Sequence, residues 1–246
     1  MEASERELVA ALADDDVRWN AQAALWELVG RGAAAVPELE LALGSRDWQQ
    51  RQMAAAALRR VEGYAPSERM FVVCVEGLAD DALPWGDSPR TFTHVANAYG
   101  SVEYLIRHAA AAEGFIAAGL HSGDAQQRFF CAYALGMAGR SGYAELICEV
   151  LAPHLNDNDV RGDAVLGVRA LYLTGDAVAP FLKDAMADAD AQGRRAIEVI
   201  LLDLRDPPGS VEEMRERWGD LRITELVHDP VVQGVGVRSV MVYRGR

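Results

Sequence analysis

The sequence predicts an all-α protein: an α-solenoid of about six helix hairpins that ends in a short extended C-terminal cap. Three observations predict this fold. An Asp and an Arg recur as a couple at a regular interval, an apolar stripe of helical period follows each Arg, and another amphipathic segment precedes each couple. The predicted solenoid covers residues 1–205 with an insertion loop near 80–91, and the predicted cap covers residues 206–246.

The couples set the period of the chain. Five times an Asp is followed four residues later by an Arg, and successive Arg residues lie 33 positions apart, except for a gap of 77 between Arg51 and Arg128. Recurrence at such a period is typical of stacked repeats. The couples are Asp14 and Arg18, Asp47 and Arg51, Asp124 and Arg128, Asp157 and Arg161, and Asp190 and Arg194.

Each couple is predicted to begin the second helix of a hairpin. Small or apolar residues follow the Arg at the third, sixth, seventh and tenth positions, which places them on one helical face. In the long gap the same spacing follows Phe92, so we predict a sixth, weaker unit there. The stripes are Ala21, Ala24, Leu25 and Leu28; Ala54, Ala57, Leu58 and Val61; Val95, Ala98, Tyr99 and Val102; Cys131, Ala134, Leu135 and Ala138; Ala164, Gly167, Val168 and Leu171; and Ile197, Ile200, Leu201 and Leu204.

The first helix of each hairpin is predicted from a further apolar-periodic segment. A hairpin of about 33 residues cannot bury this face alone and must stack on its neighbours. We expect Pro153 to kink its helix, and the glycines that follow the second helices to form left-handed caps. The predicted first helices lie near 7–12, 36–43, 69–78, 114–120, 143–155 and 178–186, and the glycines are Gly30, Gly32, Gly63, Gly139, Gly142 and Gly175.

The C-terminal cap departs from the period. A short helix is predicted over 211–218, and residues 231–243 alternate in the manner of an extended segment. We expect this segment to close the last apolar face of the array. The alternative is an exposed strand edge that pairs with a partner.

We predict a structural role for the Asp and for the Arg of each couple. Asp at a helix start can accept backbone N–H bonds and suits the positive end of the helix dipole. For the Arg residues we predict a stacked Asp–Arg ladder along the seam between units, in which each guanidinium bridges carboxylates or carbonyls. An anion-binding strip of Arg side chains is the functional alternative.

The pattern of Asp, Arg and small apolar residues resembles the HEAT-like repeat family, in the short bacterial form grouped with phycobilisome-lyase-type repeats. Residues 15–25 and 158–164 carry the resemblance most clearly, and it extends from residue 1 to about 205. The resemblance implies the solenoid fold. It implies no single function, because this family includes scaffolds, adaptors and a few enzymes.

The charge and composition of the chain limit the classes of partner that it is expected to bind. The chain has 24 basic and 37 acidic residues, a net charge of −13, and each of four segments along it is negative. Such a chain is poorly suited to neutralising phosphates, so nucleic acid is disfavoured and a basic protein partner is favoured. Polar N-terminal residues, the lack of a long apolar run and three separated cysteines predict a cytoplasmic protein without a membrane segment.

The candidate partner-binding residues follow from the predicted second helices. In such solenoids these helices line the concave face, and positions one, four and eight after each Arg would point into it. Aromatic, Gln and Arg side chains there could hold a polypeptide, although Trp26 and Phe129 could equally pack between helices. With Trp85 of the insertion loop, the candidates are Trp19, Gln22, Trp26, Gln52, Arg59, Trp85, His94, Phe129, Arg169 and Arg195.

Catalytic motifs are not found. The five histidines show no paired helical spacing, and the sequence holds no nucleophile elbow, phosphate loop or zinc-protease motif. We therefore predict no catalytic residue, metal ligand or cofactor. The predicted function is a non-catalytic scaffold or adaptor that binds a polypeptide through its concave face or its insertion loop. The alternatives are a HEAT-like enzyme, such as an alkylpurine DNA glycosylase, and a bilin-lyase or chaperone-type protein.

Overall fold

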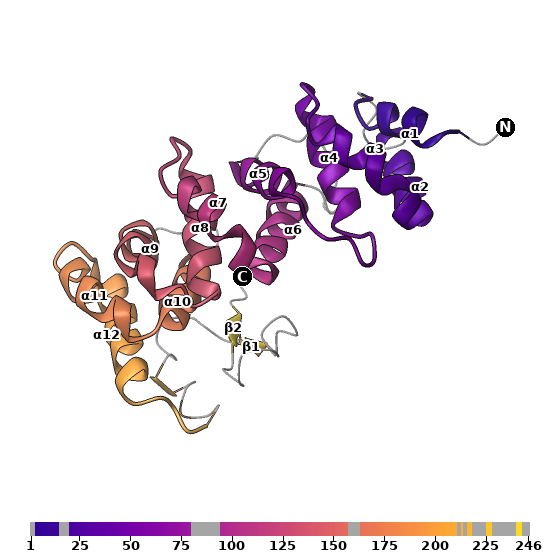
Figure 1. Ribbon diagram of the computed structural model, residues 1–246. Coiled ribbons are helices and arrows are strands. Elements are labelled where there is room, and N and C mark those ends of the chain that lie inside the picture. The colour runs from indigo at the N-terminus through magenta and orange to yellow at the C-terminus, as the bar shows by residue number, and fades with distance from the viewer. Residues whose placement is uncertain are drawn as a thin grey trace. The chain divides into compact units, whose positions relative to one another are not determined.

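The computed structural model describes residues 3–14, 20–79, 94–156, 163–210, 213, 216–217, 225–227 and 240–242. The described part consists of helices and one pair of short strands (Figure 1), so the all-α prediction is confirmed. The chain divides into two compact units, Met1–Phe130 and Cys131–Arg246. The boundary predicted at residue 206 therefore falls inside the second unit.

The first unit is built from pairs of consecutive helices. Helices α1 and α2, α3 and α4, and α5 and α6 contact one another within their pairs; α2 also contacts α4, and α4 contacts α6. On the other side, α1 contacts α3, and α5 contacts α7. The helices are α1 (Glu5–Ala11), α2 (Gln22–Arg31), α3 (Val36–Ala42), α4 (Trp48–Leu58), α5 (Glu68–Glu76), α6 (His94–Arg107), α7 (Ala109–Gly119) and the beginning of α8 (Ala125–Met137).

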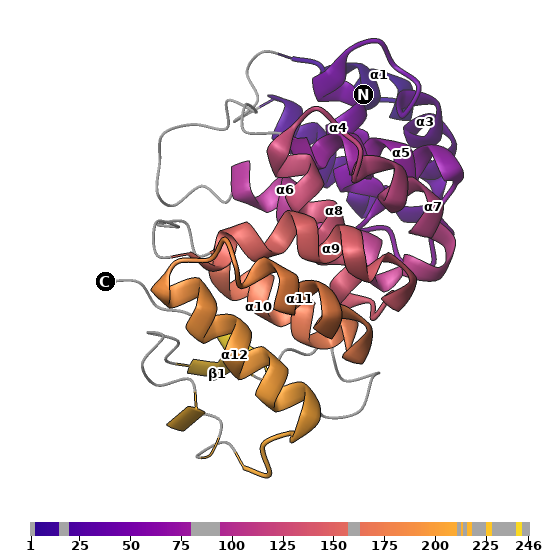
Figure 2. The same ribbon diagram turned by 90° about the vertical axis from the view of Figure 1, so that its left-hand side faces the viewer.

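The second unit repeats this alternation after the end of α8. Helix α9 contacts α11, and α10 contacts α12 (Figure 2). Short 3-10 turns lead into or extend the first helices, and two antiparallel strands pair Glu225 with Val242. The elements are α9 (Ala144–Leu151), η5 (Ala152–Leu155), α10 (Asp163–Thr174), η6 (Asp176–Val178), α11 (Ala179–Ala185), α12 (Ala191–Arg205), β1 (Glu225–Val227) and β2 (Val240–Val242).

The predicted apolar stripes form the core of both units. Ala54, Ala57 and Leu58 of α4 are fully buried, and Ile197 and Ile200 of α12 are buried in the same way. The weaker unit predicted after Phe92 is also present as a helix, α6, in which Ala98 and Val102 are buried. The burial of these stripes confirms the helical period that predicted them.

Glycine and proline residues lie where several helices end. Gly32, Gly63, Gly139 and Gly175 all have positive φ angles, between 58° and 80°, as expected for left-handed turns after second helices. At Pro153 the α-helix has already ended at Leu151, and a 3-10 turn continues the chain. The predicted kink is therefore a change of helix type, because proline cannot donate the next α-helical hydrogen bond.

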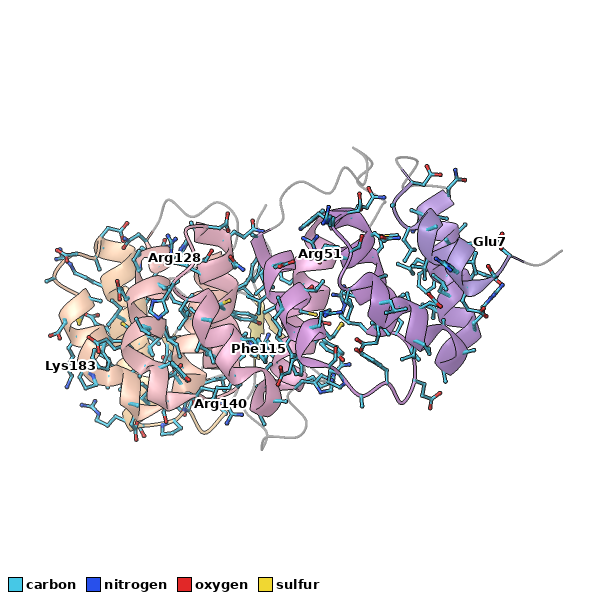
Figure 3. All side chains as sticks on the ribbon, turned by 45° about the horizontal axis from the view of Figure 1, so that its top comes forward. Glu7, Arg51, Phe115, Arg128, Arg140 and Lys183 are labelled. Carbon is cyan, nitrogen blue, oxygen red and sulfur yellow. The ribbon has the colours of Figure 1, made fainter. Side chains whose placement is uncertain are left out.

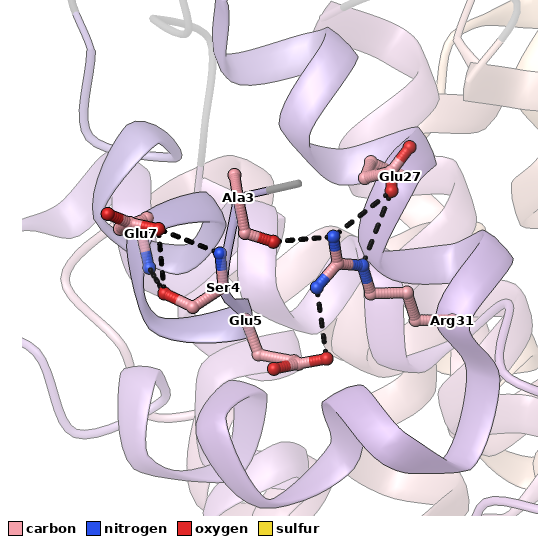
Figure 4. Close-up of polar contacts among 6 residues, drawn as sticks. All are labelled: Ala3, Ser4, Glu5, Glu7, Glu27 and Arg31. Atoms are coloured by element: carbon pink, nitrogen blue, oxygen red, sulfur yellow. Dashed lines mark hydrogen bonds and ion pairs between the residues drawn. The ribbon is translucent and has the colours of Figure 1, made fainter. Parts of the chain in front are cut away.

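Side-chain contacts hold the two ends of the described chain. Near the N-terminus, Arg31 of α2 pairs with Glu5 of α1 at 3.0 Å and donates to the Ala3 carbonyl at 2.6 Å (Figure 4). Near the C-terminus, Arg217 pairs with the buried Asp203 of α12 at 2.8 Å. Glu213 and Arg217 are helical, which agrees with the helix predicted over 211–218, and β2 contacts α10.

Candidate functional site

The Asp of each described couple caps its helix. The Asp47 carboxylate accepts the Gln50 backbone N–H at 2.7 Å, and Asp124 accepts the Gln127 N–H at 2.7 Å. Asp190 does the same at the start of α12, where it accepts the Gly193 N–H at 2.8 Å. The predicted capping role is confirmed at these three positions.

The Arg of each described couple donates to a carbonyl of the turn before its own helix, and Arg51 also pairs with Glu76 of α5 at 3.4 Å. Arg51 donates to the Ser45 carbonyl at 2.9 Å, and Arg128 donates to the Ser122 carbonyl at 2.7 Å (Figure 3). Arg194 repeats the contact with the Ala189 carbonyl at 2.9 Å. Side chains of a helix lean toward its N-terminus, so an Arg in the first turn reaches back to these carbonyls.

The couples Asp14–Arg18 and Asp157–Arg161 are not fully described by the structure. Arg18, Asp157 and Arg161 lie outside the described residues. Asp14 is described, and its carboxylate accepts a hydrogen bond from the Asn20 amide at 3.1 Å.

In the first unit, paired glutamines tie one hairpin to the hairpin before it. In α4, the Gln49 amide donates to the Leu12 carbonyl at 3.0 Å, and Gln50 donates to the Val9 carbonyl at 2.8 Å. These carbonyls lie at the C-terminal end of α1, where an α-helix leaves its own acceptors unsatisfied. The hydrogen-bonded seam therefore consists of Gln side chains and helix-end carbonyls.

The same seam recurs at the start of α8. Gln126 donates to the Leu78 carbonyl at 3.0 Å, and Gln127 donates to the Val75 carbonyl at 2.8 Å. Our sequence reasoning missed this contact. The signal was the repeated run Asp-x-Gln-Gln-Arg at 47–51 and 124–128. In the second unit, Asn156 at the end of η5 accepts the Asp190 N–H at 3.1 Å instead.

Three predicted partner-binding residues are parts of the core or of buried contacts. Gln52 is 1% exposed and donates to the Val73 carbonyl at 3.0 Å, and Phe129 is 3% exposed. Arg59 is half-buried and donates to Ser101 at 2.8 Å. The predicted exposure of Gln52 is therefore wrong, because its side chain points toward α5, whereas the burial of Phe129 agrees with the packing alternative.

The other predicted residues divide between the two units. Trp26 is 54% exposed, with the Arg60 guanidinium 5.5 Å from its ring centre. Arg195 is exposed and pairs with Glu198 at 3.8 Å. Gln22 and Arg169 are half-buried; Trp19, Trp85 and the rest of the 80–91 loop lie outside the described residues, as does the side chain of His94.

A groove lies on the other set of helices, between the first helices α9 and α11 of the second unit. Its volume is about 430 Å³. The half-buried Phe181 and Ala185 supply apolar surface, whereas Cys148 and Ala152 line the groove but are themselves buried. The full lining comprises Glu145, Cys148, Glu149, Ala152, Pro153, Asn156, Phe181, Asp184, Ala185, Asp188 and Ala189.

The charged residues of the groove are all acidic. Glu145 and Glu149 are one turn apart on α9, while Asp184 of α11 and Asp188 after its end are also four residues apart; all four are exposed. Burial and the charge of Asp184 raise the pKa of Cys148 to about 12, so this thiol stays neutral. The groove therefore combines an apolar surface with four carboxylates.

Our sequence reasoning missed this groove because it assigned recognition to the second helices. The available signal was the repetition of two acidic residues four positions apart on consecutive first-helix segments. Residues at that spacing share one helical face. That the two acidic pairs border one groove depends on the packing of α9 against α11, which no local pattern reports.

Other kinds of site are not apparent in the part of the chain that the structure describes. There, no three or more His, Cys, Asp or Glu side chains gather as a metal site would require. No helix among those residues has both the length and the apolar character needed to cross a bilayer. Compared with models of known protein families and with curated proteins, the chain matches none.

Proposed function

We propose that this protein is a non-catalytic scaffold of HEAT-like helix hairpins that binds a polypeptide partner. The observation that carries the proposal is the groove between α9 and α11, which consecutive hairpins build together. Its apolar surface and acidic border have the chemistry of a peptide-binding surface rather than that of a reaction centre.

The helix contacts support a stacked array as the framework for this groove. In each unit first helices contact first helices and second helices contact second helices, as hairpins in a solenoid do. The Gln contacts in the first unit add directional hydrogen bonds to this packing. A rigid array would hold a binding surface in place before the partner arrives, which lowers the entropic cost of binding.

Two further features fit the proposal. Trp26 of α2 is a large exposed side chain in the first unit, and it remains a candidate contact for the partner. Cys74, Cys131 and Cys148 are all free and buried, which supports a reducing compartment such as the cytoplasm.

The proposal is tested by capturing partners with the full chain in extract of the native host, and then rebuilding the complex from purified components. We expect a polypeptide that binds with defined stoichiometry in calorimetry. An unrelated protein of equal size and charge serves as the control for nonspecific attraction. Duplex DNA is tested in parallel, and salt-dependent binding of DNA without a polypeptide partner would contradict the proposal.

A further inference from the structure

The border of the α9–α11 groove carries carboxylates that the protein does not neutralise. Among the described residues, Glu145, Glu149, Asp184 and Asp188 have no ion-pair partner, although the chain contains 24 basic residues. Lys183, the only lysine of the chain, lies on α11 (Figure 3), and it is not one of the residues that line the groove. Four unpaired carboxylates around one hollow repel one another, and a cationic ligand would relieve this repulsion.

The same groove offers apolar contact between these carboxylates. The half-buried side chains of Phe181 and Ala185 supply it from the α11 side, while Cys148 and Ala152 on the α9 side line the groove but are buried. A purely polar polybasic chain would leave this surface without a contact. A volume of about 430 Å³ suits a few side chains of a bound segment rather than a folded domain.

We propose that this groove binds an amphipathic helical segment whose apolar side chains are flanked by Arg. The inference rests on the proposed function and names the chemistry of its partner. Apolar residues spaced three and four apart would enter the groove, and Arg residues beside them would meet the carboxylates of α9 and α11. Arg fits better than Lys because its planar guanidinium can donate two parallel hydrogen bonds to one carboxylate.

The negative charge of the groove disfavours other classes of ligand. A second copy of this chain has a net charge of −13 and would be repelled by the groove, and a nucleic acid backbone would be repelled in the same way. An apolar segment without cations would leave four carboxylates partly desolvated and unpaired, which is costly.

The test is a selection of 16-residue peptides from a random displayed library on the immobilised full chain. The enriched peptides are then measured in solution against the wild type, a groove variant and a control variant. The groove variant is Glu149→Gln with Asp188→Asn, which removes one carboxylate from each side. The control is Asp176→Asn with Glu216→Gln, two exposed carboxylates of the second unit that do not line the groove.

We expect enriched peptides with Arg beside helically spaced apolar residues. Their affinity should fall about tenfold in the groove variant and less than about twofold in the control, because each rim ion pair contributes modestly. Added salt should weaken binding to the wild type more than to the groove variant. Circular dichroism checks that both variants remain folded, and hydrogen exchange should show peptide protection on α9 and α11.

The outcomes separate the two proposals. If peptides are enriched but bind the groove variant as tightly as the wild type, or protect other helices, the groove inference is wrong and a polypeptide-binding scaffold still stands. If acidic peptides are enriched, the predicted chemistry is wrong in the same way. If no peptide is enriched and extract of the native host yields no polypeptide partner, the proposed function fails together with the inference.

Discussion

Gly136 of α8 marks a place where two helices approach so closely that a single methyl group matters. A Cβ at this position would lie 2.7 Å from the Ala170 carbonyl oxygen and 2.8 Å from the Ala170 Cβ of α10. Both distances are shorter than van der Waals contact, and the carbonyl belongs to a helical backbone that cannot rotate away. The absence of a side chain at Gly136 therefore permits the contact between these helices.

Gly136→Ala should reduce the free energy of unfolding by about 1–3 kcal/mol through overpacking, despite the higher helix propensity of Ala. Gly114→Ala in the middle of α7 is the matched control, since nothing lies within 4 Å of its added Cβ. That control should stabilise the protein by up to about 1 kcal/mol. Urea unfolding measures both changes, and equal effects of the same sign would contradict the close contact.

Arg51 shows the local role of the Arg in a couple. It donates to the Ser45 and Arg46 carbonyls, at 2.9 and 3.3 Å, and pairs with Glu76 of α5 at 3.4 Å. Arg51→Ala should lower the free energy of unfolding by about 1–2 kcal/mol, because it leaves the part-buried Ser45 carbonyl without this donor and removes the pairing with Glu76. Binding of the partner should stay nearly unchanged.

The neighbouring exposed Arg46 provides the control for this prediction. Arg46→Ala removes a charge of the same sign from the same turn but spares the contacts that close it. Thermal unfolding of the two variants distinguishes them. If Arg51→Ala instead left stability intact and weakened partner binding, the Arg residues of the couples would have to be reassigned to a binding surface.

At the scale of the element, the glutamine pairs explain how one hairpin is fastened to another in the first unit. A helix exposes unsatisfied carbonyls at its C-terminal end, and the Gln amide has donors that match them. The pairs at 49–50 and 126–127 make this contact with the same spacing of acceptors, Val9 with Leu12 and Val75 with Leu78. A repeated side-chain contact of this kind favours one register of stacking over others.

Gln127→Glu should destabilise the protein more than Gln127→Ala. The alanine loses one hydrogen bond to the Val75 carbonyl, worth about 1 kcal/mol, whereas the isosteric glutamate also places a negative charge against that carbonyl. The comparison is made by urea unfolding at neutral pH. A glutamate variant as stable as the wild type would show that the amide donor contributes nothing to the seam.

The terminal elements depend on carboxylates with lowered pKa values. The pKa of Glu5 in α1 is lowered by a backbone N–H bond and by Arg31, and that of Glu213 is lowered by the Gly209 N–H and by Arg217. A carboxyl group with a depressed folded-state pKa stabilises the fold above its unfolded pKa. That stability is lost as the pH falls through the folded value.

Helix α1 and the segment around residues 209–217 should therefore loosen in acid before the core unfolds. As the pH falls below about 4, we expect faster hydrogen exchange in α1 and around residues 209–217 than in α4. Glu213→Gln is the control, because it should make the exchange near Arg217 faster at neutral pH and less dependent on pH. Uniform loosening of all helices would contradict this account.

At the scale of the whole molecule, the structure divides the chain at a place that the repeat pattern does not mark. The boundary between the two units falls within α8, after Phe130, and the segment beyond residue 206 belongs to the second unit. The period of the couples is uninterrupted through this point, since Arg128 and Arg161 keep the 33-residue interval. Periodicity in a sequence reports recurring local structure, whereas a unit boundary depends on how many contacts cross it.

Sequence patterns located the helices well and the surfaces poorly. The 3, 3, 1, 3 spacing after each Arg predicted the buried faces of α4 and α12, because helix geometry alone places those residues on one side. The same reasoning placed Gln52 on an exposed face and left Phe129 between two alternatives, because an error of one position turns a side chain by about 100°. Residues at the edge of a stripe are therefore the ones whose burial a period cannot decide.

Local sequence patterns indicated the helices, their apolar faces, the capping Asp residues and four of the six predicted glycine turns, because these depend on residues a few positions apart; Gly30 and Gly142 do not have positive φ angles. The distant carbonyl that each Gln reaches, and the groove that Glu149 and Asp188 share, became apparent from the three-dimensional packing alone. Those outcomes join segments far apart in the chain. They depend on how helices pack, and packing is set by the combined shape of many side chains rather than by any local spacing.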